Sequence, residues 1–166
     1  MTRTPAPSPD VDLRFVNQDM PALLILNPSN VVARDIKWTV ALWNQDLPDR
    51  TDPLPIPVST FDWLRPHENG GPEALFDAPR VTSLVKPGDH LFGSASVVCP
   101  TCIRGRTYIV YIEYGKGGWF VELPDEHSGH IVLPENVSKE GRGRYFAALE
   151  QAAAEHNRVP IEDHSK

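Results

Sequence analysis

Two cysteines and two histidines are the residues of this chain whose types and spacing best suit the binding of a metal ion. Cys99 and Cys102 form a C-x-x-C motif, and 24 intervening residues separate Cys102 from the pair His127 and His130. Two thiolates and two imidazoles satisfy the tetrahedral preference of zinc. The sequence therefore predicts a structural zinc site at these four residues, with a separation between the two pairs that exceeds the usual finger spacing.

Three other interpretations of the cysteine motif stay open. Dithiol chemistry needs a lowered thiolate pKa, which a helix N-terminus behind the first cysteine usually supplies, whereas a β-rich segment follows here. In an oxidising compartment the two cysteines could form a disulfide across the turn. In the simplest interpretation the motif is a turn that contains two cysteines, and the histidines are exposed on the next loop. The sequence contains no G-x-S-x-G, P-loop or dinucleotide-binding motif.

Three predicted strands position the cysteine motif. They are rich in small, β-branched and aromatic residues and span residues 94–98, 107–114 and 119–123. The glycine-rich link between the last two is too short for anything except a hairpin. An up-down-up meander then brings the turn at 99–105 and the segment after Leu123 to the same end of the sheet, as the four-ligand site requires.

Alternation of apolar and polar residues predicts further strands in the first half of the chain. In the clearest one, apolar side chains share one face, namely Ile36, Trp38, Val40 and Leu42. Other predicted strands begin near Val11 and cover Ala22–Leu26, as a central strand, and 58–64. Residues 66–72 are predicted to break the chain, and Lys86–Asp89 to form a turn.

Seven to nine short strands and one terminal helix predict an all-β fold, an antiparallel β-sandwich with an appended amphipathic helix. Seventeen prolines among 166 residues also favour loops and edge strands over long helices. The expected organisation is a disordered tail over 1–10, a sandwich domain over 11–134, and a helix and tail over 135–166. The helix is predicted to begin near Ser138 and to end near Asn157, and the final residues are predicted to fray.

The segments Ala22–Ser29 and Ala33–Trp38 resemble the second and third strands of bacterial immunoglobulin-like sandwich domains. In those domains an apolar strand ends in Asn with a small residue nearby, and the next strand opens with Ala. Lys86–Asp89 and Gly105–Tyr108 are similar to the turn before the fifth strand and to the tyrosine corner that opens the sixth. The resemblance covers residues 11–123 and implies an immunoglobulin-like sandwich, without the inter-sheet cysteine pair of antibody domains. It implies the fold alone, because such sandwiches carry many functions.

Charge and hydropathy disfavour several classes of partner and location. A formal net charge of −6 gives no electrostatic footprint for nucleic acid or an anionic membrane. No apolar run approaches the ~18 residues of a membrane helix, so the chain as written is expected to be cytoplasmic, or extracytoplasmic if it is a fragment of an anchored protein. We expect a non-enzymatic interaction or structural module with a protein partner. The alternative is a zinc-stabilised or thiol-active domain that uses the two cysteines and two histidines.

Overall fold

The computed structural model spans residues 1–166, and the structure describes residues 7–17, 21–47, 53–56, 59–76, 79–123, 140, 144, 147, 151 and 159–163. The strands in these ranges are β1 (Asp12–Asn17), β2 (Pro21–Leu26), β3 (Ala33–Asn44), β4 (Ser59–Leu64), β5 (Asn69–Ala74), β6 (His90–Val98), β7 (Arg106–Glu113), β8 (Gly117–Glu122), β9 (Val159–Pro160) and β10 (Glu162–Asp163). A short helix, α1 (Pro79–Thr82), lies between β5 and β6.

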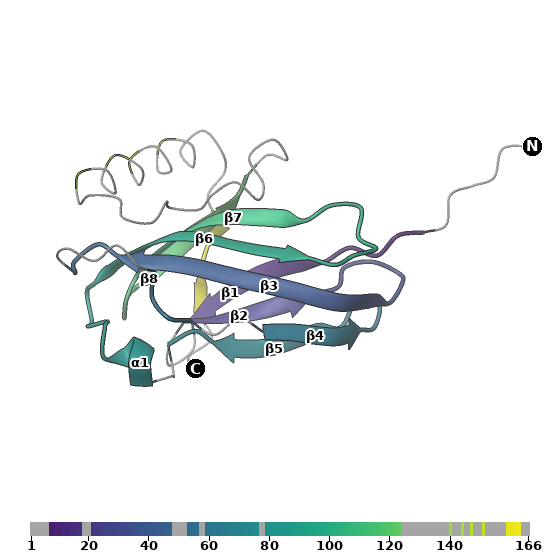
Figure 1. The fold of residues 1–166 in the computed structure, drawn as a ribbon, viewed down its shortest axis with the longest axis horizontal. Coiled ribbons are helices and arrows are strands. Elements are labelled where there is room, and N and C mark those ends of the chain that lie inside the picture. The colour runs from purple at the N-terminus through teal and green to yellow at the C-terminus, as the bar shows by residue number, and fades with distance from the viewer. Residues whose placement is uncertain are drawn as a thin grey trace, which may run out of the picture.

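The strands form two sheets that lie one over the other (Figure 1). The first has the order β10-β1-β2-β5, and the second has the order β4-β3-β6-β7-β8-β9. Neighbouring strands are antiparallel in every described pair except β1 and β10, which are parallel. The prediction of an all-β fold is confirmed, and so are the strand at Ala22–Leu26 inside its sheet and the strand predicted at 58–64.

One hydrophobic core lies between the two sheets. On β3 the predicted face is confirmed, because Ile36, Trp38, Val40 and Leu42 are all buried. β1 contributes Leu13 and Phe15 from the other sheet, as its alternation predicted. Across the gap the rings of Phe15 and Phe120 lie 5.2 Å apart between centroids. Alternation is therefore a good guide to burial here, since each sheet presents one face to the shared core.

The last described residues connect the two sheets, and the prediction that they fray is wrong. β9 pairs with β8 of the six-stranded sheet, whereas β10 pairs with β1 of the four-stranded sheet. Between them Ile161 packs against the core and donates its N–H to the carbonyl of Gly118 at 3.0 Å. Strands of two residues are too short to produce a period-two pattern, so the sequence alone could not reveal them.

Residues 69–74 form β5, although proline and glycine predicted a break here. β5 is an edge strand of its sheet, where a proline removes no hydrogen bond from an inner ladder. Gly70 has a structural role, since a Cβ there would lie 2.8 Å from the ring of Phe61. The composition of this strand therefore reflects its place at the edge and the close approach of β4.

The predicted C-terminal helix falls largely outside the described residues, and so does Ser138, near which it is predicted to begin. The structure describes four of its residues, which are helical and exposed: Glu140, Arg144, Ala147 and Gln151. In the part of the chain that the structure describes, no helix is long and apolar enough to cross a membrane.

Candidate functional site

The predicted meander is present and places the cysteine turn as expected. β6 pairs with β7, and β7 pairs with β8, in a continuous antiparallel run. The N–H of Leu123 donates to the carbonyl of Thr107 at 2.8 Å, next to the point where the 99–105 turn enters β7. The chain beyond Leu123 therefore starts at the end of the sheet that holds both cysteines.

Cys99 and Cys102 form a disulfide, with their Cα atoms 5.2 Å apart. Zinc binding and thiol chemistry both need a thiolate, so this oxidised form has neither capacity. Cys99 is buried in the core, 2% exposed, and a turn rather than a helix follows it. His127 and His130 lie outside the described residues, and within the described ranges no group of three or more His, Cys, Asp or Glu could hold a metal ion. The zinc site stays a prediction that requires reduced cysteines.

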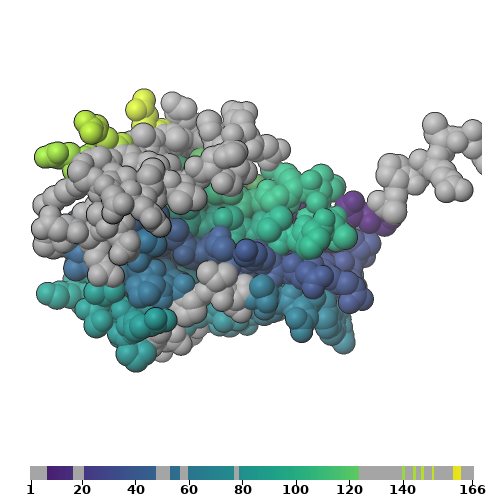
Figure 2. Space-filling view, viewed as in Figure 1, coloured from purple at the N-terminus to yellow at the C-terminus, as the bar shows by residue number. Residues whose placement is uncertain are grey.

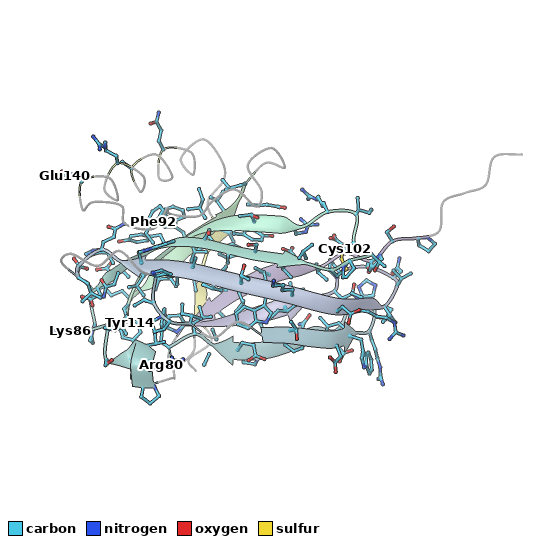
Figure 3. All side chains as sticks on the ribbon, viewed as in Figure 1. Arg80, Lys86, Phe92, Cys102, Tyr114 and Glu140 are labelled. Carbon is cyan, nitrogen blue, oxygen red and sulfur yellow. A yellow bond between two sulfur atoms is a disulfide. The ribbon has the colours of Figure 1, made fainter. Side chains whose placement is uncertain are left out.

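Three connections meet at the end of the molecule that carries the disulfide. These are residues 27–32 between β2 and β3, residues 65–68 between β4 and β5, and residues 99–105 between β6 and β7. Their proximity follows from the strand registers, because Leu26 pairs with Asn69, and Ala33 pairs with Leu64. We call these three segments, with the strand residues that border them, the loop end. Cys102 marks it in Figure 3, opposite Lys86 and Arg80.

Asn27 is the polar centre of the loop end. It is 1% exposed, and its side-chain amide donates to the carbonyls of Val31 at 2.8 Å and of Leu64 and Arg65 at 3.1 Å each. Its carbonyl oxygen accepts hydrogen bonds from the backbone N–H and the hydroxyl of Ser29. A buried amide that is bonded on both sides fixes the positions of the segments it joins. Asn27 therefore holds the 27–32 and 65–68 segments together.

Further contacts stabilise the same two segments. The Nε2 atom of His67 lies 2.8 Å from the side-chain oxygen of Asn30. The guanidinium of Arg65 lies over the ring of Trp63, 5.2 Å from its centroid, at a cation-π distance. The disulfide closes the third segment in the same way, so all three connections are held by specific interactions.

The loop end also carries most of the exposed apolar side chains in the described part of the chain. Of five large hydrophobic residues that are exposed there, four belong to it, namely Val32, Trp63, Val98 and Ile103. The fifth, Val159, lies on β9. These four residues follow the order of neighbouring strands, from β4 through β3 and β6 to the turn that enters β7. Figure 2 shows the violet-blue and green segments of this end meeting on one surface.

Arg106 connects the loop end to the first sheet. Its guanidinium donates to Asp10 at 2.7 Å and to Glu122 at 3.0 Å, and its Nε donates to the carbonyl of Val11 at 3.0 Å. Burial lowers the pKa of Arg106, but the hydrogen bond with Asp10 and the charges of Asp12, Asp10 and Glu122 together outweigh burial and raise it. Arg106 is therefore a permanently charged link between β7 and the segment that precedes β1.

Tyr108 differs from the tyrosine corner that the resemblance implied. It lies in β7, and its hydroxyl donates to the carboxylate of Asp12 on β1 instead of to a nearby backbone carbonyl. Burial, and then the hydrogen bond with Asp12, raise the pKa of Tyr108. The tyrosine therefore joins two sheets, which a local corner does not do.

A cavity of about 390 Å³ lies between β1 and β8, bordered by β9. Its lining includes Asp12, Arg14 and Glu122. Two of these groups are already engaged, since Asp12 accepts from Tyr108 and Glu122 accepts from Arg106. Both carboxylates of the lining therefore accept hydrogen bonds from side chains of β7.

Sequence reasoning placed the site at the cysteine turn and missed its neighbours. In the sequence the run Asn27-Pro28-Ser29-Asn30 marks the end of a strand, and Asn followed by Pro and Ser is also a typical turn sequence. That signal could have identified the 27–32 segment as an ordered turn. The exposure of Trp63 has no comparable signal in the sequence, because it depends on the register of β4 with β3.

Comparison with known proteins gives no match to a family model, to a curated protein or to a solved structure.

Proposed function

We propose that this chain is a non-enzymatic protein-interaction module on an immunoglobulin-like β-sandwich, and that the loop end is its contact surface. The observation that carries the proposal is the gathering of four exposed apolar side chains on connections held by a disulfide and a buried amide. Exposed apolar groups that cluster on a soluble domain mark interaction sites. Rigid connections reduce the ordering cost of binding.

The strand order supports the immunoglobulin-like part of the proposal. The series β1-β2-β5 and β4-β3-β6-β7 follows the order of strands A-B-E and C′-C-F-G in immunoglobulin sandwiches. In that correspondence the 27–32 and 99–105 segments are the B–C and F–G connections. These lie at the end that antibody variable domains use for binding.

An appended C-terminal helix is the second part of the proposed architecture. The four described residues of the predicted helix are all exposed, and their spacing places them on one side of a helix. A second apolar cluster lies on the side of the six-stranded sheet that faces away from the core, with buried Trp43, Phe92 and Ile109. The predicted helix has an apolar face that suits such a surface.

The disulfide is evidence about the cellular compartment in which the protein resides. Disulfides persist in oxidising environments and are rare in the reducing cytosol. The pairing of Cys99 with Cys102 therefore supports the extracytoplasmic alternative for this protein.

Photocrosslinking tests the interaction surface with a matched pair of positions. A benzophenone amino acid replaces Val98, 45% exposed at the loop end, or Val159, 46% exposed on β9. In an extract of the native source we expect the Val98 label to form a discrete protein adduct that excess unlabelled chain competes away, and the Val159 label to form none. Equal labelling from both positions, or no competed adduct, contradicts the proposal.

A zinc-stabilised or thiol-active domain is the second candidate function. It is favoured by the meander, which starts the chain after Leu123 beside the cysteine turn. Purified under reducing conditions without a histidine tag, the chain would then contain about one zinc per molecule, and a chelator would lower the melting temperature. His127→Ala and Cys99→Ser would each remove the metal. A zinc content near zero with chelator-insensitive melting excludes this candidate.

A further inference from the structure

The two sheets part along one side of the sandwich, where β9 and β10 cover only a portion of the gap. β10 pairs with the last two residues of β1, and β9 pairs with Trp119 and Phe120 of β8. In the described part of the chain, residues 12–15 of β1 and 121–122 of β8 therefore have a neighbouring strand on one side only. The cavity of about 390 Å³ lies between these two stretches, beside the C-terminal segment that is yellow in Figure 1.

Most of the cavity wall is apolar. It includes Leu13, Phe15 and Phe120, which belong to the core, and Leu26 and Val159, which are more exposed. An apolar cavity of about 150 Å³ already holds benzene. The cavity between β1 and β8, at about 390 Å³, is therefore large enough for a small molecule with a side chain of the size of leucine or phenylalanine.

Two carboxylates of the lining each have one oxygen without a hydrogen bond from any described residue. Asp12 accepts its bonds from Tyr108 and from the backbone through the same atom, Oδ1. Glu122 likewise uses only Oε1 in its ion pairs with Arg104 and Arg106. An ionised carboxylate can accept about four hydrogen bonds through its two oxygens. Asp12 Oδ2 and Glu122 Oε2 can therefore accept from a ligand that carries several N–H donors.

Arg14 adds a positive charge to the lining. Its side chain is exposed, and among the described residues it has no carboxylate partner. It lies two positions from Asp12 on the same face of β1, about 7 Å away along the strand. Arg106, which lies next to the lining, is already paired with Asp10 and Glu122. A ligand that matches the lining therefore carries a positive and a negative charge close together, beside an apolar group.

We propose that this cavity binds a free α-amino acid with a large apolar side chain. Its ammonium group donates to Asp12 and Glu122, and its carboxylate accepts from the guanidinium of Arg14. Its side chain packs against Phe15 and Phe120. An organic cation would leave Arg14 without a partner, and an organic anion would leave both carboxylate oxygens without one, whereas the zwitterion pairs all three groups. This inference goes beyond the protein contact proposed above and does not depend on it.

Titration of the isotopically labelled chain with L-leucine and L-phenylalanine, followed by amide NMR shifts, tests the site. We expect saturable shifts at residues 12–15 and 121–122. N-acetylleucine lacks the ammonium group and leucinamide lacks the carboxylate, so each should bind about tenfold more weakly than leucine. The absence of saturable shifts in both stretches overturns the proposal. Equal affinity for leucine and its two derivatives overturns the zwitterion as the ligand.

Two matched pairs of variants test the assigned contacts. Arg14→Gln should lower the affinity for leucine about tenfold and leave that for leucinamide unchanged, whereas Arg34→Gln, at an exposed arginine of β3, should change neither. Val159→Trp fills the cavity and should abolish binding, whereas Val98→Trp should not, although the two valines are 46% and 45% exposed. All four positions are exposed, so an unchanged amide spectrum away from the cavity verifies the fold. Equal weakening of leucine and leucinamide by Arg14→Gln, or wild-type binding by Val159→Trp, overturns the proposed site.

Discussion

Tyr108 on β7 donates its hydroxyl hydrogen bond to Asp12 on β1, and this contact joins the two sheets of the molecule. Asp12 also accepts a hydrogen bond from the backbone N–H of Leu13 at 2.8 Å. The carboxylate of Asp12 thus accepts one hydrogen bond from the backbone at the start of β1 and one from the side chain that reaches across from β7. Arg106, two residues before Tyr108, makes a second connection of this kind through its ion pair with Asp10.

Tyr108→Phe should remove an alkaline loss of stability. Burial, and then the hydrogen bond with Asp12, raise the pKa of Tyr108 above its ordinary value of 10.0. The folded state therefore keeps a proton that the unfolded state releases, so this contribution is complete below about pH 10 and decreases as the pH rises further. Urea unfolding between about pH 8 and 11 should show a shallower decline for Tyr108→Phe than for wild type. Tyr114→Phe is the control, and an unchanged slope in Tyr108→Phe contradicts the assignment.

Asp46→Asn should remove a loss of stability at acidic pH, whereas Tyr108→Phe removes one at alkaline pH. The pKa of Asp46 is lowered from 3.8, chiefly by the hydrogen bond from the backbone N–H of His90, against a smaller opposing effect of burial. A lowered pKa contributes stability above about 3.8 that is lost as the pH falls through the folded value. Stability measured from about pH 6 down to 3 should therefore fall less steeply in Asp46→Asn. Asp62→Asn is the exposed control, and equal acid slopes for wild type and Asp46→Asn rule out the contribution.

Alternation predicted the fold well where one face of a strand meets the core along its whole length. On β3 the register from Ile36 to Leu42 was readable because every second residue is apolar and buried. The predicted turn at Lys86–Asp89 is also confirmed, since the N–H of Asp89 donates to the carbonyl of Lys86 and Gly88 has a φ of 93°. Both signals are local, and local signals survive without knowledge of the partner strand.

The candidate site was less predictable because it depends on contacts between distant segments. The meander located the cysteines, but the choice between a disulfide and free thiols depends on compartment as well as on distance. Asn27 bonds to Leu64 and Arg65, which are nearly forty positions away along the chain. Similarly, β9 and β10 gain their conformation from the edges of β8 and β1. No period in the sequence encodes such pairings.

Trp38→Ala should be severely destabilised. Trp38 is 3% exposed within the core between the sheets, and truncation of a buried Trp removes its packing and leaves a cavity. Such changes cost about 3 to 5 kcal/mol. The free energy of unfolding from urea titrations checks this value. Trp63→Ala, at a more exposed position, is the matched control and should lose only about 1 kcal/mol, chiefly the cation-π contact with Arg65. A Trp38→Ala midpoint equal to wild type would place Trp38 outside the core.

Gly93→Ala should be destabilised because its methyl group would clash with the backbone of the neighbouring strand. Gly93 lies in β6 between Leu42 of β3 and Val110 of β7, and a Cβ at this position would lie 1.9 Å from the carbonyl oxygen of Ala41. Backbone in the middle of a sheet cannot move aside as a side chain does, so the inner strands must separate. Overpacking in cores costs typically about 1 to 3 kcal/mol, and a backbone clash should reach the upper part of that range or exceed it.

Gly105→Ala is the matched control for Gly93→Ala, since its Cβ would lie no closer than 3.4 Å to any neighbouring atom. Alanine also restricts the unfolded chain, which favours folding by about 0.4 to 1 kcal/mol where the native backbone accepts it. We therefore expect Gly105→Ala to equal or exceed wild type in the urea midpoint and Gly93→Ala to fall well below it. If the two variants unfold at the same midpoint, β3 and β6 do not approach as closely at Ala41 as the structure shows.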